Sequence, residues 1–336
     1  MAKPKREPEE IFDEEREQVL ERVCAIDVAK DSGQVCVRMP SPGGRRSSKI
    51  WVVDASTNAV LKLGQHLLEQ RIEMVTLEST SDYWRIFYYL LEACGLPVQL
   101  VNARDARNVP GRPKSDKIDA VWLAKLTERG MLRASFVPPR PIRVLRDYTR
   151  TRIDLTRDRT RHWQRLEKLL EDGLIKISVV ASAMTTMSVR LMVEALIRGE
   201  RDPHVLAELA QGRMRTKRPA LVQALTGAFD EHHGELATIL LGQIDALTVQ
   251  IEHLTTRIEQ LIAELPGTDP TDPANPAHTP GPDQPGHPDQ ATPTHRTVIA
   301  RLADIPGISA QAAQVIVAEI GTDMTRFPTP QHLVSW

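Results

Sequence analysis

The stretch VCAIDVAKDSGQVCVRM, residues 23–39, decides the fold of the first part of the chain. It opens with a short apolar run, turns at Asp31-Ser32-Gly33 and continues with apolar residues at alternate positions. Two apolar segments separated by such a turn predict a β-hairpin. Asp27 interrupts the first strand, and a carboxylate there is costly to bury unless it is paired or binds a metal ion. An aspartate facing water at the end of the strand is the simpler alternative.

Strands and helices then follow in mixed order after a Gly/Ser-rich loop, SPGGRRSS. The expected elements are strands at residues 50–53, 71–77 and 98–101 and helices at residues 59–70 and 84–94. In the first helix Leu61, Leu67 and Leu68 are expected to face inward. This order predicts an α/β domain with a mixed sheet, in which ligands bind beyond the strand ends. Glu78 follows such a strand, although an ordinary turn carboxylate would also explain it.

A second acidic motif, GRPKSDKIDA at residues 111–120, opens an apolar-patterned helix. Asp116 and Asp119 are three residues apart and therefore share one helical face. Paired carboxylates repel each other unless a cation lies between them, and Mg²⁺ prefers oxygen ligands. The alternative is an acidic helix start favoured by capping and by the helix dipole. Together with Asp27 and Glu78 they form a set of four carboxylates suited to a two-metal site, with Mg²⁺ ions about 4 Å apart.

Charge along the 336-residue chain is segregated, although the net charge is only −1. Residues 133–168 hold eleven Arg or Lys against four acids, whereas the first 23 residues hold eight acids against five bases. Three cysteines without metal-ligand spacing predict a reduced intracellular protein. The sequence shows no leader and no apolar run of membrane-spanning length, so a cytoplasmic protein without membrane contact is expected.

Two basic segments are candidates for nucleic-acid binding. The loop before the acidic pair and the helix expected at residues 142–171 both concentrate cations, and arginine forms bidentate contacts with phosphate. Solvated or neutralising charges are the alternative reading. Tyr148 and Trp163 are candidates for stacking on bases, with core packing as the simpler reading. The basic candidates are Arg104, Arg107, Arg112, Lys114, Arg143, Arg146, Arg150, Arg157, Arg161, Arg165 and Lys168.

The next region is expected to be helical. Helices are predicted at residues 185–198, from Asp202-Pro203 onward and at residues 221–232, with a basic connector at residues 212–219. His232 and His233 are expected to be surface residues. A heptad seam follows, and a coiled-coil homo-oligomer or packing on the helix at residues 142–171 would cover it. The seam consists of Leu240, Ile244, Leu247, Ile251, Leu254, Ile258, Leu261 and Leu265.

A proline-rich segment at residues 266–294 predicts a flexible linker and a domain boundary. Beyond it, two apolar helices flank the turn Ile305-Pro306-Gly307-Ile308-Ser309. This pattern is typical of a helix-hairpin-helix, in which the backbone at Gly307 and the following helix start can bind a phosphate. A Pro-Gly turn between helices is also simply a good connector.

These motifs resemble, in order and spacing, the RuvC-like DEDD transposases of bacterial insertion sequences, the IS110 family. The resemblance is carried by AIDVAKD, LES, VNARDAR and KSDKIDAVWLAKL, and after the linker by DMTRF and HLVSW. It implies a ribonuclease-H/RuvC-like α/β fold in which Asp27, Glu78, Asp116 and Asp119 form the catalytic Mg²⁺ site. Where members commonly show Glu-x-Thr-Gly, this chain reads Glu78-Ser79-Thr80-Ser81. A serine thus replaces the glycine at position 81, so the turn after Glu78 is expected to differ.

The resemblance also implies a function. It points to a DNA transposase or recombinase of the bridge-RNA-guided type, which binds DNA and a structured guide RNA and cuts and rejoins DNA strands. It further implies a serine nucleophile; Ser309 and Ser335 lie in the wrong segments, so the nucleophile is expected beyond the end of this chain. A RuvC-like structure-specific nuclease and a catalytically inactive nucleic-acid-binding remnant are the alternatives.

The expected domain organisation follows from these segments. It comprises an arm (1–22), a RuvC-like catalytic domain (23–141), a helical and coiled-coil region (142–265), the linker (266–294) and the start of an incomplete C-terminal transposase domain (295–336).

Overall fold

The computed structural model describes residues 20–41, 45–79, 81–102, 116–265, 297–327 and 329–334. The chain divides into two compact units, Met1–Val137 and Pro138–Trp336. Most of the expected N-terminal arm and all of the expected linker lie outside the described residues. None of the described helices is both long and apolar enough to cross a membrane.

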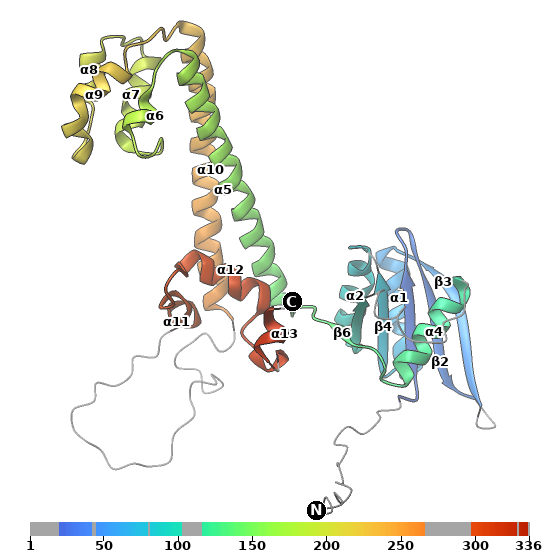
Figure 1. Ribbon diagram of the computed structural model, residues 1–336. Coiled ribbons are helices and arrows are strands. Elements are labelled where there is room, and N and C mark those ends of the chain that lie inside the picture. The colour runs from blue at the N-terminus through green and yellow to red at the C-terminus, as the bar shows by residue number, and fades with distance from the viewer. Residues whose placement is uncertain are drawn as a thin grey trace, which may run out of the picture. The chain divides into compact units, whose positions relative to one another are not determined.

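The first unit is built on a six-stranded mixed sheet (Figure 1). The strands lie in the order β3-β2-β1-β4-β5-β6, with β1, β4 and β5 parallel and the remaining pairs antiparallel. This arrangement, an antiparallel hairpin followed by parallel strands added beside β1, is the ribonuclease-H/RuvC-like fold predicted from the sequence. The strands are β1 (Val23–Val28), β2 (Ser32–Pro40), β3 (Arg46–Asp54), β4 (Met74–Ser79), β5 (Val98–Asn102) and β6 (Ala134–Ser135).

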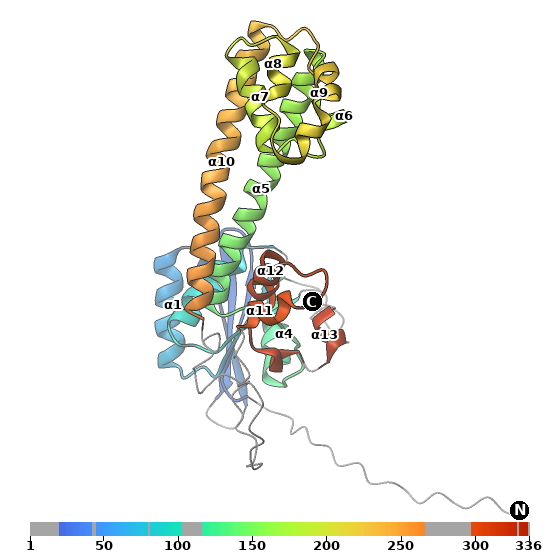
Figure 2. The same ribbon diagram turned by 90° about the vertical axis from the view of Figure 1, so that its left-hand side faces the viewer.

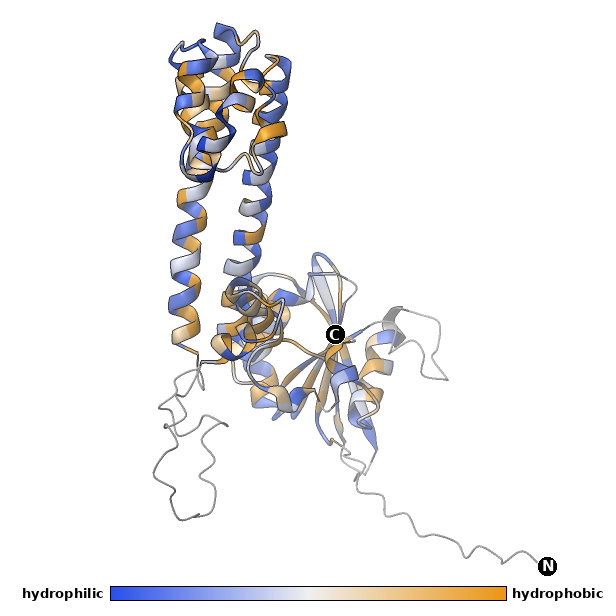
Figure 3. Cartoon of the chain, turned by 60° about the vertical axis from the view of Figure 1, so that its left-hand side comes forward, coloured by the Kyte–Doolittle hydropathy of each residue, from blue (hydrophilic) through white to orange (hydrophobic). Residues whose placement is uncertain are grey.

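Helices cover both faces of this sheet because β1 is apolar on both sides. Successive side chains of a strand point to opposite faces. Cys24 and Ile26 pack in the cluster that includes residues of α1 (Thr57–Glu69) and α2 (Trp84–Ala93). Val23 and Ala25 pack instead with α4 (Asp116–Glu128). Several strands of the sheet are apolar in the hydropathy colouring (Figure 3).

The structure corrects several details of the expected α/β domain. Strand β3 begins at Arg46, inside the expected loop, because its pairing with β2 continues to the end of that strand. Leu61 and Leu68 of α1 are exposed, and Leu67 alone of the three expected residues is buried. A 3.6-residue period places the buried face at Val60, Leu63, Gly64 and Leu67. The segment before the arginine-rich helix also contains a short strand, β6, which was not among the expected strands.

Two helices of 33 residues, α5 (Arg140–Asp172) and α10 (Glu231–Ala263), lie side by side in the second unit (Figures 1 and 2). They are antiparallel: Ile142 shares a cluster with Ile258, whereas Leu170 shares another with Leu241. The heptad seam therefore packs on α5 of the same chain, the second of the two arrangements left open by the sequence. The isoleucines of the seam are buried, whereas Leu240 and Leu261 are partly buried at the edges of these clusters.

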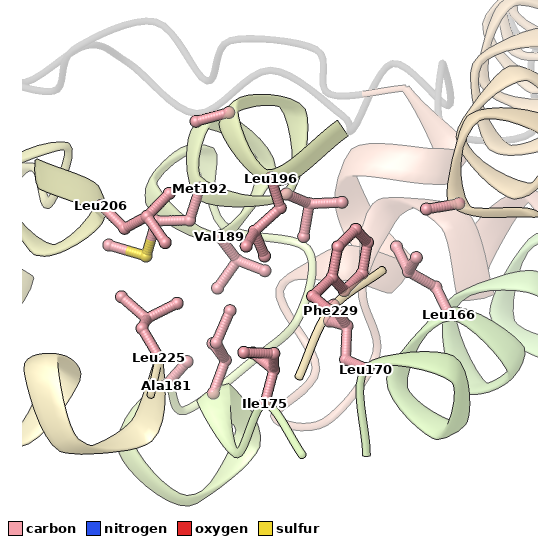
Figure 4. Packing of buried hydrophobic residues seen from close by; sticks show 14 of the residues in the cluster. Leu166, Leu170, Ile175, Ala181, Val189, Met192, Leu196, Leu206, Leu225 and Phe229 are labelled. Atoms are coloured by element: carbon pink, nitrogen blue, oxygen red, sulfur yellow. The ribbon is translucent and has the colours of Figure 1, made fainter. Parts of the chain in front are cut away.

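A small helical bundle lies at one end of this hairpin (Figures 1 and 2). Its core contains Leu170, Val189, Leu206, Leu225 and Phe229, which point toward one another in Figure 4. The helix expected at residues 221–232 is in fact split: α9 ends at residue 224 and α10 begins at residue 231. The bundle consists of α6 (Ile177–Val180), α7 (Met187–Ile197), α8 (Pro203–Glu208), the 3-10 helix η1 (Gly212–Lys217) and α9 (Arg218–Ala224).

The opposite end of the hairpin carries the C-terminal helices (Figure 2). Two of them flank the predicted Pro-Gly turn, which confirms a helix, turn and helix at this position. Val317 and Ala318 pack with Ile142, Leu145 and Ile258. The elements are α11 (Val298–Ala303), α12 (Ala310–Ile320), the 3-10 helix η2 (Met324–Arg326) and α13 (Pro330–Val334).

Candidate active site and nucleic-acid interface

The carboxylates predicted on strands are neighbours in the structure. Asp27 of β1 and Glu78 of β4 are directly paired positions in the parallel register. Asp27 lies two residues after Ala25, which packs toward α4, and Glu78 lies two residues after Thr76, which hydrogen-bonds to α4. Because alternate residues share a face, both carboxylates belong to the α4 side of the sheet, at the carboxyl ends of their strands. Glu78 is buried and Asp27 is half-buried.

Helix α4 directs its first turn toward the same edge. Its last residue, Glu128, accepts a hydrogen bond from the backbone N–H of Leu20, just before β1 (3.0 Å). The helix therefore runs back along β1, with its N-terminal turn, the position of Asp116 and Asp119, at the carboxyl end of the strand. Asp119 is half-buried. The side chain of Asp116 lies outside the described part of the chain.

Sequence reasoning did not anticipate the polar contact that fixes α4 on the sheet. The hydroxyl of Thr127 lies 2.8 Å from that of Thr76, and both residues are buried. The same Thr127 hydroxyl also lies 2.8 Å from the carbonyl oxygen of Leu123. This contact sets the position of α4 relative to β4 and hence of Asp119 relative to Glu78. A threonine in an apolar strand gives no sequence signal for such a pairing.

The donor set fits a hard cation in its chemistry, since every candidate ligand is a carboxylate. Among the described side chains, Asp27, Glu78 and Asp119 do not form a group of three whose oxygens all lie within 4.8 Å of one another. A two-metal centre distributes its ligands over two ions about 3.5–4 Å apart, so such tight grouping is not required of it. The described carboxylates therefore match a divalent cation in their chemistry without forming one compact cage.

A tighter group, Asp172, His232 and His233, occurs in the second unit, with ligand atoms within 4.8 Å of one another. His233 is buried, which corrects the expectation that both histidines are surface residues. Its Nδ1 accepts a hydrogen bond from the backbone N–H of Asp230 (3.1 Å), and its Nε2 lies 3.3 Å from Asp172. The proton of the neutral ring is then on Nε2, so this ring caps α10 and has no lone pair left for a metal.

The basic candidates in the loop before α4, Arg104, Arg107, Arg112 and Lys114, lie outside the described residues. Those on α5 fall into two groups. Near its start, Arg143 donates to the carbonyl of Pro138 (2.9 Å). Arg146 donates to the carbonyls of Ala318 (3.2 Å) and Glu319 (2.5 Å), which belong to the last turn of α12.

This last contact gives two of the predicted residues a structural role. Carbonyls in the last turn of a helix lack intrahelical partners, and Arg146 supplies donors for two of them. Arg150 forms a two-pronged ion pair with the Glu319 carboxylate, with both contacts at 2.9 Å. Arg146 and Arg150 thus hold α12 against α5, and their assignment as nucleic-acid contacts remains a prediction. Arg152, which is buried, adds a hydrogen bond to Gln314 (2.7 Å).

The second group, farther along α5, remains exposed. Arg157 pairs with Asp154 (3.3 Å) and Arg161 pairs with Asp158, each one turn away. Exposed pairs of this kind contribute about 0.2–1 kcal/mol, so a phosphate can displace the aspartates at small cost. Arg165 and Lys168 are also exposed. Tyr148 and Trp163 are partly buried against the hydrophobic clusters, in agreement with the core-packing alternative.

The turn between α11 and α12 is exposed at Gly307, whose φ of 93° is the left-handed conformation that glycine adopts readily. Ser309 caps α12, since its hydroxyl oxygen accepts a hydrogen bond from the N–H of Ala312 (3.1 Å). Ser335 lies outside the described residues. A pocket of about 560 Å³ between α8 and α9 contains none of the predicted site residues.

Comparison with known proteins identifies the family. A family model for transposases of the DEDD type in the IS110 group matches residues 24–174. A second model, for the transposase IS116/IS110/IS902 family, matches residues 299–336. A comparison with curated protein sequences gave no match.

Solved structures show slight likeness. Thermus thermophilus RuvC is 13% identical over 34% of this chain and 99% of its own, with a TM-score of 0.26. The same protein in complex with a Holliday junction substrate is 12% identical over 34% of this chain and 99% of its own, with a TM-score of 0.27. An exopolyphosphatase from Cytophaga hutchinsonii is 12% identical over 66% of this chain and 98% of its own, with a TM-score of 0.20. At these TM-scores the likenesses carry no weight for function.

The strand order and the carboxylates at the edge of the sheet define the first unit as a RuvC-like domain of a DNA-acting enzyme. The two family matches, at opposite ends of the chain, agree with each other. The chain belongs to the IS110 family of transposases.

Proposed function

We propose that this protein is a DNA transposase or recombinase that cuts and rejoins DNA strands with Mg²⁺ held by Asp27, Glu78, Asp116 and Asp119. The observation that carries the proposal is the paired register of Asp27 and Glu78 on the face of the sheet that α4 covers. Membership of a transposase family supports the choice of DNA as the substrate. The same proposal places the protein in the cytoplasm.

Each carboxylate has a distinct structural support. Asp27 and Glu78 are fixed by the backbone hydrogen bonds of two adjacent strands, whereas Asp119 stands on a helix anchored through Thr127. When bound, Mg²⁺ neutralises charge on the phosphate and lowers the pKa of a coordinated water. The rigid strands keep the carboxylate oxygens in place, so little reorganisation is needed when the DNA arrives.

The partners follow from the charged and apolar surfaces. Arg157, Arg161, Arg165 and Lys168 form an exposed cationic stretch suited to a phosphate backbone. Family resemblance supports a structured guide RNA as a second partner, and the loop cations Arg104, Arg107, Arg112 and Lys114 together with Gly307 are further proposed contacts. Half-buried Leu247 and Leu254 in the middle of the hairpin favour a homo-oligomer in which a second hairpin covers them.

The test is the substitution Asp119→Asn, which removes one charge and keeps the side-chain shape. We expect Mg²⁺-dependent cleavage of a branched DNA duplex to fall on the order of 100-fold, while DNA binding stays within about two-fold of the original affinity. Asp54→Asn, at an exposed position at the end of β3, is the matched control and should leave cleavage unchanged.

Unchanged cleavage and unchanged Mg²⁺ affinity in Asp119→Asn would overturn the proposed metal site. Cleavage without rejoining by the original protein would favour the structure-specific nuclease, and binding without cleavage would favour the inactive remnant.

A further inference from the structure

The bundle at the end of the α5–α10 hairpin lies outside both family matches, which end at residue 174 and resume at residue 299. It is nevertheless a folded element with a closed core, since Val189, Leu206, Leu221 and Phe229 are almost fully buried. At 1.5 Å per residue, the 33 residues of α5 span about 50 Å, and the bundle packs on the C-terminal turns of this helix. Neither family match assigns a role to this element.

The bundle carries an uninterrupted basic segment. Between Glu208 and Asp230 the chain has four cations and no acid, and the cations are Arg213, Arg215, Lys217 and Arg218. Three of them belong to η1 and all three are exposed. A run of cations without compensating acids is the electrostatic pattern of a surface that meets a polyanion.

The structure distinguishes two of these cations from the others. Arg218 forms an ion pair with Glu208 (2.8 Å), and the Lys217 ammonium donates to the carbonyl of Val180 (2.8 Å). Within the described residues, Arg213 and Arg215 form no ion pair. Their charges are therefore directed to solvent, while the two neighbouring cations hold η1 on the bundle.

The backbone beneath these two arginines is fixed. Met214, which lies between them, is half-buried and packs against the bundle core. The Thr216 hydroxyl donates to the carbonyl of Arg213 (2.9 Å), and the Met214 N–H donates to the carbonyl of Gln211 (3.1 Å). A partner that binds here pays the ordering entropy of two side chains but not of the loop.

From this arrangement we propose that η1 is a second nucleic-acid contact, in which Arg213 and Arg215 bind backbone phosphates at the other end of the hairpin from the C-terminal helices (Figure 2). The guanidinium group matches phosphate in a two-pronged geometry, and such contacts carry affinity without base specificity. The flanking Gly212 and Thr216 are small and exposed, so a phosphate backbone can approach closely. The inference rests on the proposed function, because it assigns a further contact to the nucleic acid on which the enzyme acts.

The experiment measures binding of the full chain to a labelled 30-base-pair DNA duplex and, separately, to an RNA hairpin of similar length, over a range of NaCl concentrations. The test variant is Arg213→Ala with Arg215→Ala. Losing two phosphate contacts should reduce the magnitude of the slope of log affinity against log salt by about 1.8. Raising the salt from 0.05 to 0.2 M should then weaken binding by a factor about 12-fold smaller for the variant than for the original protein. If the slope changes only for the DNA duplex, DNA binds the bundle; if it changes only for the RNA hairpin, RNA binds there.

Two controls accompany the variant. Arg213→Lys with Arg215→Lys keeps the charge and should keep the slope, because the slope counts neutralised phosphates. Lys49→Ala with Lys62→Ala removes the same charge from exposed positions of the first unit and should also leave the slope unchanged. Unfolding curves of the test variant should match the original, since both substituted side chains are exposed.

Equal slopes for the original protein and the double-alanine variant in both arms would overturn the inference and leave the proposed function standing. Absence of salt-dependent binding by the original protein to either nucleic acid would instead overturn the proposed function and the inference with it.

Discussion

The substitution Phe229→Ala tests whether the bundle is held by its own core. Phe229 is 2% exposed, its ring stacks on that of His233 with centroids 5.4 Å apart, and the Arg201 guanidinium lies 5.3 Å from its centroid. Truncating a buried phenylalanine costs about 3–5 kcal/mol through lost burial and the cavity left behind. A cost of about 4 kcal/mol raises the unfolded fraction of the second unit roughly 1,000-fold, against a typical total stability of about 5–15 kcal/mol.

Urea unfolding measures the cost, and hydrogen exchange locates it. The amides of α7 and α9 should exchange faster in the variant, whereas those of β1 and β4 should not change, because the core of the first unit shares no residue with that of the bundle. Val179→Ala, at a position 80% exposed, is the control and should change stability by less than about 0.5 kcal/mol. A cost below about 1.5 kcal/mol for Phe229→Ala, or faster exchange in β1, would refute the assignment of a separate bundle core.

Two further predictions concern ionisable groups. Hydrogen bonds from Arg190 lower the pKa of Asp245; the resulting stabilisation is present above the unfolded pKa of about 3.9 and lost as the pH falls through the lower folded pKa. Thermal unfolding from pH 6 to pH 2.5 should therefore show a stability advantage over Asp245→Asn that shrinks toward the acid end. The advantage should be under about 1 kcal/mol because the pair is half-exposed; an advantage independent of pH would contradict this. Burial raises the pKa of Cys24 and raises that of Cys36 to about 11, so at pH 8 a thiol reagent should label Cys94 in the folded protein and the other two only after unfolding. Equal labelling rates for all three would show that β1 and β2 are not buried as described.

Local patterns explain why much of the first unit follows from the sequence. The alternation in residues 23–39 specifies a hairpin, and the apolar runs predicted as strands at residues 71–77 and 98–101 form the parallel strands β4 and β5. The order of Asp27, Glu78, Asp116 and Asp119 along the chain marks them as candidates, and the structure brings the first two into register. Their assignment as metal ligands remains a prediction for Asp119→Asn to test.

The arginine-rich helix shows where local patterns are insufficient. Arg146 and Arg157 look alike in sequence, since each lies on a long amphipathic helix with other cations one turn away. Arg146 is committed to carbonyls of α12, 172 and 173 residues away along the chain, whereas Arg157 pairs with a neighbouring aspartate and stays exposed. No periodicity encodes a partner at that separation, because hydrogen-bond donors are satisfied by whatever the tertiary fold brings near.

The sequence by itself determined the hairpin and the parallel strands of the sheet, the order of the four carboxylates, the heptad seam and the turn at Gly307. These features depend on the residue period and on local backbone preferences, which act over a few residues. Tertiary structure alone decided that Asp27 and Glu78 occupy paired positions on β1 and β4 and that Thr127 anchors α4. It also decided that the seam packs on α5 and that His233 of α10 contacts Asp172 of α5. These contacts join elements that are distant in the sequence. They contribute to stability only after the chain has closed the loops between those elements, so no local pattern encodes them.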